Sequence, residues 1–142
     1  MTRTLSATTL AAVLVLCLAG LTNDELRTPF DRAERLASRR GTLLLVDFAT
    51  DWCGWCRKLE REVYPEPAVA AQLSRVVYVR VDAEREGAAL AQRYGVDGFP
   101  TLLFLTPSGS LAGQIVGFLP APEFAAKARG IIDASRGPAS PR

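Results

Sequence analysis

The chain has 142 residues, of which 49% are hydrophobic and 23% are charged, a composition that suits one globular domain with a buried core. Its formal net charge is +2 and no run of like charges exceeds two residues, which argues against binding to nucleic acid. The sequence contains no histidine, so histidine-activated nucleophiles, histidine metal ligands and histidine-bound haem are excluded.

The first residues are typical of an export signal rather than of a folded domain. A short basic start precedes an apolar stretch that is too short for a membrane span, so we predict a signal peptide over residues 1–19, cleaved after Ala19. Residues 20–27 then form a linker, and the mature protein is expected in the periplasm. Two alternatives stay open: an uncleaved membrane anchor, because Leu21 prolongs the apolar stretch, and lipid attachment at Cys17.

Beyond the linker, the residue pattern predicts alternating helices and strands. A helix begins at Pro29, with Thr28 as its N-cap residue, and ends before Gly41. The next run, residues 43–50, is almost entirely apolar, as in a strand buried on both faces, so we place it at the centre of a sheet. The remaining predicted elements are helices 56–63 and 68–73, strand 76–82, helix 88–94, strands 101–106 and 111–116 joined by a turn, and a last helix 122–134.

This order of elements predicts one α/β domain over residues 28–136. Its strands run in mixed directions, and we expect a central sheet of about four strands flanked by helices. Residues 137–142 are rich in Pro, Ser and Gly and are predicted to be a frayed tail.

Cys53 and Cys56 are the two cysteines of the predicted domain. In an exported protein such a pair is a structural cross-link or a redox centre, and so small a loop removes little chain entropy. Because a helix N-terminus favours thiolate, we interpret Cys53 as the exposed nucleophile and Cys56 as the more buried resolving thiol. The alternatives are an incidental pair of core cysteines and a zinc site shared between chains. We therefore expect no metal, and no cofactor other than a Cys53–Cys56 disulfide.

Two carboxylates stand near this pair in the sequence. Asp47 interrupts the apolar central strand, where burial raises the pKa of a carboxyl group, so it is a candidate base for the proton of Cys56. An aspartate at the strand end that binds backbone is the alternative. Glu60 lies one helical turn after Cys56, and it either shares in proton transfer or pairs with Arg57 or Arg61 as a solvated side chain.

Three motifs together resemble the thioredoxin superfamily over about residues 28–130. They are Val46-Asp47-Phe48, Trp52-Cys53-Gly54-Trp55-Cys56 and Gly98-Phe99-Pro100-Thr101. Residues 49–53 and 56–60 are similar to the C-terminal periplasmic domain of DsbD and related small exported proteins. The resemblance therefore implies a thioredoxin fold.

The resemblance also implies roles for particular residues. Asp47 takes the place of the buried acid of the family, and Glu60 that of a second acid in the DsbD group. Pro100 takes the place of the cis-proline, although an X-Pro bond is otherwise expected to be trans. The implied substrate-contacting residues are Trp52, Gly54, Trp55, Phe99, Pro100 and Thr101.

Trp55 departs from the usual dipeptides of the superfamily between the two cysteines. A tryptophan here restores a backbone N–H that proline lacks. A donor near Cys53 favours the thiolate, so we predict a reduction potential less negative than the roughly −270 mV of thioredoxin.

The predicted function is that of a thiol:disulfide oxidoreductase acting on exported proteins, more as a reductase or electron relay than as an oxidant. It would receive electrons from a membrane or soluble thiol donor, and we expect a monomer. Two alternatives remain: an oxidant or isomerase on the same fold, and a module that binds extended peptides without turnover.

Overall fold

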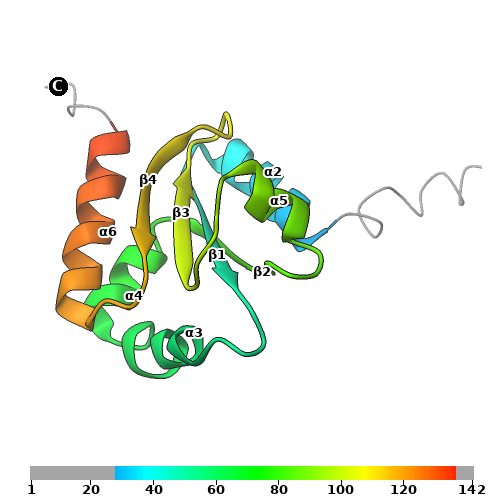
Figure 1. The fold of residues 1–142 in the computed structure, drawn as a ribbon. Helices are drawn as coiled ribbons and strands as arrows, with labels where there is room; N and C mark the ends of the chain where they lie inside the picture. Colours follow the sequence, from blue (N-terminus) through cyan, green and yellow to red (C-terminus); the bar gives the residue numbers. More distant parts are fainter. Residues whose placement is uncertain (1–27, 137–142) are drawn as a thin grey trace, which may run out of the picture.

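The structure, a computed structural model, describes residues 28–136, and its centre is a four-stranded sheet in the order β2-β1-β3-β4 (Figure 1). Strand β1 (Leu44–Ala49) pairs in parallel with β2 (Val77–Asp82) and antiparallel with β3 (Thr101–Leu105). Strand β4 (Leu111–Val116) runs antiparallel to β3 at the other edge. The predicted mixed sheet and the central place of the apolar strand are therefore confirmed.

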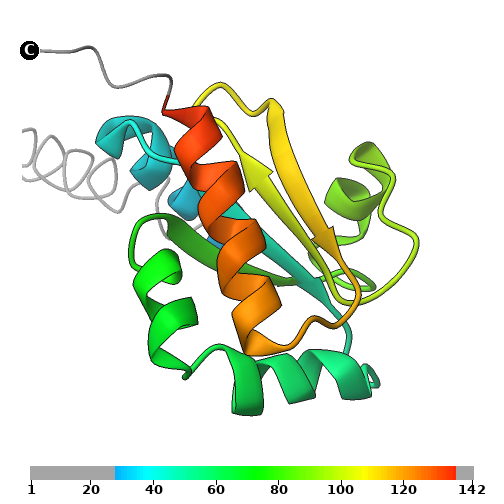
Figure 2. The same ribbon diagram turned by 90° about the vertical axis from the view of Figure 1, so that its left-hand side faces the viewer.

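Helices cover both faces of this sheet (Figures 1 and 2). Helices α2 (Pro29–Arg40) and α5 (Ala88–Arg93) lie on one face. The other face carries α3 (Gly54–Lys58), the π-helical turn η1 (Leu59–Val63), α4 (Pro67–Leu73) and α6 (Ala121–Ser135). Among the helices of residues 28–136, none combines the length and the hydrophobicity of a membrane span. The predicted signal peptide 1–19, the linker 20–27 and the tail 137–142 lie outside the described residues.

Helix α2 begins and ends on the signals expected from the sequence. The Thr28 side chain accepts a hydrogen bond from the Asp31 N–H, and the Asp31 carboxylate accepts one from the Thr28 N–H, which forms a capping box. At the other end, Gly41 adopts the left-handed conformation with φ of 60°, which a residue without Cβ adopts at low cost. The helix then packs Ala37 against the sheet.

Alternation along β1 decides which of its side chains face the cysteines. Leu44, Val46 and Phe48 pack on the side of α2 and α5, so Asp47 and Ala49 point to the opposite side. Ala49 packs against both cysteines. Asp47 therefore lies two residues before Ala49, the residue that packs against the disulfide, on the same face of β1.

The helix after the cysteines differs from the predicted α-helix over residues 56–63. It starts earlier, at Gly54, and after Lys58 it widens into η1, where the Tyr64 N–H donates to the Leu59 carbonyl at 2.9 Å. This i to i+5 bond is that of a π-helix, which hydrophobic periodicity does not signal. The other elements match their predicted bounds to within one residue at each end.

Candidate active site around the Cys53–Cys56 disulfide

Cys53 and Cys56 form a disulfide at the start of α3. Cys53 is the N-cap residue of the helix, and its Sγ accepts a hydrogen bond from the Cys56 N–H at 3.1 Å. The Cys53 N–H donates to the Thr50 carbonyl at 3.2 Å, which fixes the approach of the chain to the helix.

The prediction that Cys53 is the exposed partner is wrong for this disulfide form. Cys53 is 3% exposed and Cys56 is 2% exposed. Both cysteines pack against Ala49 of β1 and against Phe99 from the loop before β3. Position at a helix N-terminus therefore does not by itself bring the first cysteine to the surface.

The hydrogen bond to Cys53 Sγ also bears on Trp55. The donor is the backbone N–H of Cys56. The predicted change in reduction potential instead relied on the backbone N–H of Trp55, which a proline at this position would lack. A chain with proline at position 55 would keep the Cys56 N–H, so this contact does not distinguish the two cases. The reduction potential stays a prediction, without the contact proposed for it.

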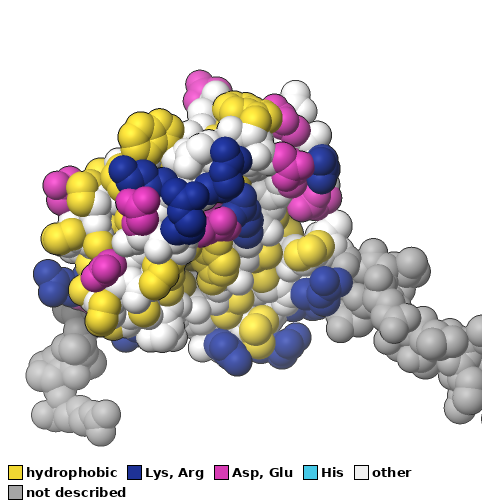
Figure 3. Space-filling view, turned by 90° about the horizontal axis from the view of Figure 1, so that it is seen from below, with side chains coloured by type: hydrophobic (Ala, Val, Ile, Leu, Met, Phe, Trp, Pro, Cys, Tyr) yellow, Lys and Arg dark blue, Asp and Glu magenta, His cyan; other side chains and the backbone are white. Residues whose placement is uncertain are grey.

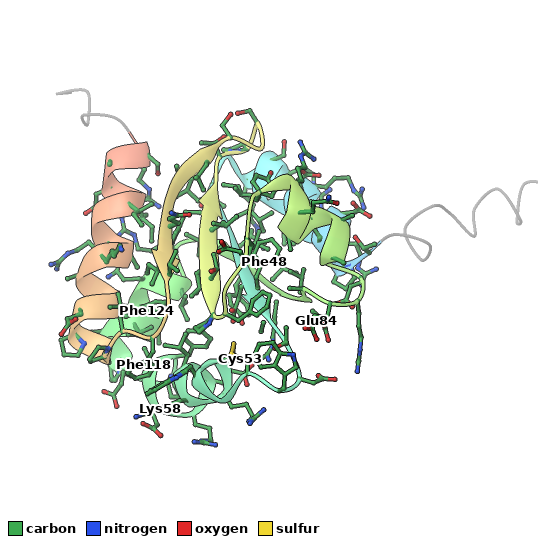
Figure 4. All side chains as sticks on the ribbon, in the orientation of Figure 1. Phe48, Cys53, Lys58, Glu84, Phe118 and Phe124 are labelled. Atoms are coloured by element: carbon green, nitrogen blue, oxygen red, sulfur yellow. A yellow bond between two sulfur atoms is a disulfide. The ribbon has the colours of Figure 1, made fainter. Side chains whose placement is uncertain are left out.

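Two exposed tryptophans flank the disulfide. Trp52, 65% exposed, donates from Nε1 to Glu84 Oε2 at 3.0 Å and meets the Phe99 ring edge-on, with centroids 6.0 Å apart. Trp55, 56% exposed, lies beside Phe118 on the opposite side. Figure 4 shows Cys53 between Glu84 on one side and Lys58 and Phe118 on the other.

The segment from Phe99 to Thr101 forms the third side of the site. The Phe99–Pro100 peptide bond is cis. Thr101 is buried, starts β3 and donates from its hydroxyl to the Gly98 carbonyl at 2.7 Å. The Pro100 carbonyl accepts from the Gly117 N–H at 2.8 Å, so this loop is tied to the end of β4.

Asp47 is buried, with 2% of its surface exposed. Its Oδ2 accepts hydrogen bonds from the hydroxyls of Tyr64 and Tyr78, each at 2.9 Å. Burial raises the pKa of Asp47, while the two hydroxyls and the nearby Arg80 guanidinium act in the opposite direction and lower it. The alternative in which this carboxylate binds backbone is not what the structure shows, because its partners are side chains.

Glu60 forms an ion pair with Arg80. The alternative pairing with Arg57 or Arg61 is therefore wrong. Arg57 instead donates to the Asp51 carbonyl at 2.7 Å, and Arg61 lies 3.7 Å from Glu62. Glu60 is connected to Asp47 through Arg80, which faces Asp47 in the parallel register of β1 and β2.

Comparison with known proteins gives the family. The model of the thioredoxin-like domain matches residues 30–131. The chain belongs to the thioredoxin-like family.

Relatives and solved structures agree with this assignment. The thioredoxin-like chain is 31% identical over 108 residues to the thiol:disulfide interchange protein DsbD of Pseudoalteromonas atlantica, which covers 72% of the chain and 18% of that relative. A thioredoxin from Thermus thermophilus superposes with a TM-score of 0.66 at 33% identity, covering 72% of this chain and 83% of that one. The oxidised C-terminal domain of DsbD from Neisseria meningitidis gives 0.63 at 21% identity, covering 70% and 90%, which shows the shared fold. The chain spans less than a fifth of the length of the first DsbD relatives that it matches.

Of the predicted site residues, Phe99 packs against the two cysteines, while Asp47 and Glu60 contact other side chains. Trp52, Gly54 and Trp55 surround the cysteines in sequence, and Phe99 joins them from the loop before β3. Tyr64 and Tyr78, which hold Asp47, were not predicted. The strand pattern carried a signal for Tyr78, since it alternates with buried Val77 and Val79 and so shares a face with Arg80.

The charged side chains near this end of the molecule are of both signs. On the face seen in Figure 3, Lys and Arg side chains lie next to Asp and Glu, with hydrophobic side chains between them. Within residues 28–136, no group of three or more His, Cys, Asp or Glu side chains is placed to hold a metal ion.

Proposed function

We propose that the protein is a thiol:disulfide oxidoreductase that acts on exported proteins by cycling Cys53 and Cys56 between dithiol and disulfide. The observation that carries this proposal is the disulfide between the two residues at the start of α3, on the side of the sheet that holds the buried Asp47. The relatives named thiol:disulfide interchange protein support the same chemistry.

The reaction starts from the reduced pair. The Cys53 thiolate attacks a substrate disulfide, whose S–S bond breaks as a mixed disulfide forms, and the first substrate sulfur leaves as a thiolate and takes a proton. Cys56 then gives its proton to Asp47 and attacks Cys53 Sγ. The second substrate thiolate leaves and is protonated. Two electrons have then passed from the pair to the substrate, and the Cys53–Cys56 disulfide of the structure remains.

The substrate would lie as an extended segment across the loop before β3. Phe99, directly before Pro100, packs against the disulfide, and no backbone partner of the Phe99 N–H or C=O lies within the described residues. Those two groups are available to pair with a peptide in the manner of an added strand. Trp52 and Trp55, on either side, offer exposed apolar surface to its side chains.

Electron flow towards the substrate defines a reductase or relay, recharged by a membrane or soluble thiol donor. An oxidant would run the same steps in reverse, and an isomerase would run them in both directions without net transfer of electrons. Alkylation of cells followed by mass measurement separates them: a reductase is mostly dithiol, and an oxidant mostly disulfide. Equilibration with a glutathione buffer then gives the reduction potential.

The proposal is tested by trapping. Cys56→Ser leaves Cys53 able to form mixed disulfides that cannot be resolved, so it should capture substrates covalently. Cys53→Ser is the matched control and should capture none. Insulin reduction that survived Cys53→Ser would rule out the dithiol mechanism, and peptide binding with no turnover in the unaltered protein would favour a binding module.

The site of action follows from the predicted signal peptide 1–19. We propose that the domain works as a monomer in the periplasm, where its substrates are the disulfides or thiols of other exported proteins. Fractionation of cells that make the tagged protein tests the location, and gel filtration with light scattering tests the monomer.

A further inference from the structure

Tyr64 and Tyr78 reach Asp47 from two different elements. Tyr64 follows η1, whereas Tyr78 lies in β2, and their rings meet edge-on with centroids 6.0 Å apart. The Tyr64 ring also packs edge-on against Phe124 of α6, at 5.8 Å. These ring contacts fix the direction in which each hydroxyl points.

Both hydroxyls act only as donors to Asp47. Burial raises the pKa of Tyr64 and of Tyr78, and the neighbouring carboxyl raises both further, so the phenols keep their protons at any working pH. Each phenol has one proton to donate, and both protons go to Oδ2. Oδ1 is buried and has no hydrogen-bond partner within the described residues.

The two carboxyl oxygens of Asp47 therefore differ. Oδ2 accepts two hydrogen bonds, while Oδ1 accepts none within the described residues. An unpartnered buried acceptor lowers the stability of the fold, and proton transfer is a functional reason to keep one. Ala49, one strand repeat along from Asp47 on the same face, packs against Cys56. The unpartnered oxygen is thus the one left to exchange a proton with the resolving thiol.

We propose that Tyr64 and Tyr78 are positioning residues which hold Oδ2 of Asp47, so that Oδ1 takes the proton of Cys56 during resolution of the mixed disulfide. In that step the Cys56 S–H bond breaks, the proton goes to Oδ1, and the new thiolate attacks Cys53 Sγ. The inference rests on the proposed function.

Other groups around Asp47 set the direction of each expected effect. Arg80 of β2 faces Asp47 and favours its ionised form, and η1 contributes Glu60, which pairs with Arg80. The partner in β3 is the apolar Leu102, and α6 contributes Phe124 to the Tyr64 ring. On the same face lie Asp82 at the end of β2 and, beyond Ala49, the cysteines of α3.

Each tyrosine hydroxyl lowers the pKa of Asp47, whereas burial raises it. Loss of one hydroxyl removes part of the lowering effect, so the pKa of Asp47 should rise.

The first experiment follows the Asp47 carboxyl carbon by NMR titration of the oxidised protein, in which neither cysteine titrates. Tyr64→Phe and Tyr78→Phe should each move the titration of Asp47 to higher pH, and the double variant should move it further. Tyr94→Phe is the matched control, because the Tyr94 hydroxyl donates to the Gly109 carbonyl instead. If the Tyr64 and Tyr78 variants titrate like the control, the proposal is wrong.

The second experiment measures release of a bound mixed disulfide as a function of pH. Below the midpoint of the profile, each tyrosine variant should release its partner about tenfold more slowly, the factor that one hydrogen bond to a charged acceptor represents. The midpoint should shift by the same amount as the NMR titration. A slower rate with an unshifted midpoint would mean a structural role only.

The two experiments also separate this inference from the proposed function. The NMR titration needs no substrate, so it reports on the hydroxyls even if the protein proves to be a binding module. Tyr78 is 39% exposed, so Tyr78→Phe tests the contact with little change to the core. Near-ultraviolet circular dichroism of each variant verifies that the fold is kept.

Discussion

Trp55 and Phe118 lie side by side, with ring centroids 5.2 Å apart, although one belongs to α3 and the other to the segment after β4. Nζ of Lys58 lies 5.3 Å from the centroid of the first ring and 5.0 Å from that of the second. A cation over aromatic faces is attracted to both rings. Trp55 and Phe118 therefore form an apolar surface near the disulfide, and the ammonium group of Lys58 lies over both rings.

Replacing this indole should weaken substrate binding. Trp55→Ala removes a large, mostly exposed surface, so KM for a protein substrate should rise about threefold to tenfold, in the range usual for aromatic contact residues. Reduction of a small aromatic disulfide should keep its rate, because such a molecule needs no peptide surface. An unchanged KM for the protein substrate would place its contacts elsewhere.

Because Asp47 is buried, the free energy of unfolding of the protein should fall as the pH rises and the carboxyl group ionises. Below the ordinary pKa of an aspartate, about 3.9, both folded and unfolded chains are protonated. Above it, the unfolded chain ionises while the folded chain stays protonated up to its raised pKa, so the free energy of unfolding falls through that window. Each unit of pKa difference corresponds to about 1.4 kcal/mol.

Asp47→Asn should remove this loss, since an amide does not ionise and its oxygen still accepts from both tyrosines. Urea unfolding at several pH values is the measurement: the variant should match the unaltered protein at pH 3 and exceed it at pH 7. Asp97→Asn changes an exposed carboxylate and serves as control. Equal gains for the two variants would mean that burial of Asp47 carries no cost.

The ion pair of Glu60 and Arg80 should tune Asp47 in two opposite directions. Glu60→Gln removes a negative charge and releases Arg80, so the pKa of Asp47 should fall. Arg80→Gln removes the cation that lowers this pKa, so it should rise. NMR titration of the oxidised protein measures the pKa of Asp47 in both variants. Glu62→Gln is the control, because Glu62 lies in the same turn but pairs with Lys58. Shifts of the same sign would refute this coupling.

Two glycines should respond oppositely to alanine. A Cβ on Gly113 in β4 would lie 2.8 Å from Cγ1 of Ile131, so Gly113→Ala should destabilise the fold by about 1–3 kcal/mol through overpacking. Gly130 in α6 has open space around the same position, and Gly130→Ala should stabilise by about 0.5–1 kcal/mol through helix propensity. Thermal unfolding of both variants measures the difference, and an unchanged stability of Gly113→Ala would show that the Ile131 side chain or α6 can move aside.

Much of the fold could be predicted because its signals are local. The apolar run of β1, the capping residues of α2 and the turn before β4 each depend on a few neighbouring residues, and the sequence places each of them to within one residue. The burial of Asp47 followed in the same way, from an acid inside an apolar strand.

The partners of the site residues could not be predicted in this way, because they come from distant parts of the chain. Tyr64 and Tyr78 meet Asp47 only once η1 has packed on the sheet and β2 has paired with β1. The pairing of Glu60 with Arg80 likewise depends on how η1 packs against β2, because Arg80 lies twenty residues beyond Glu60 in the chain. Burial of Cys53 depends on Phe99, which lies far along the sequence.

The π turn at Leu59–Val63 implies a pattern of insertions and deletions among relatives. A π turn holds one residue more than an α turn, and the side chains after it are rotated accordingly about the helix axis. Tyr64 stands directly after this extra residue. Relatives one residue shorter between the second cysteine and this position should therefore present a different side chain to the buried acid, and a sequence alignment should place the gap there.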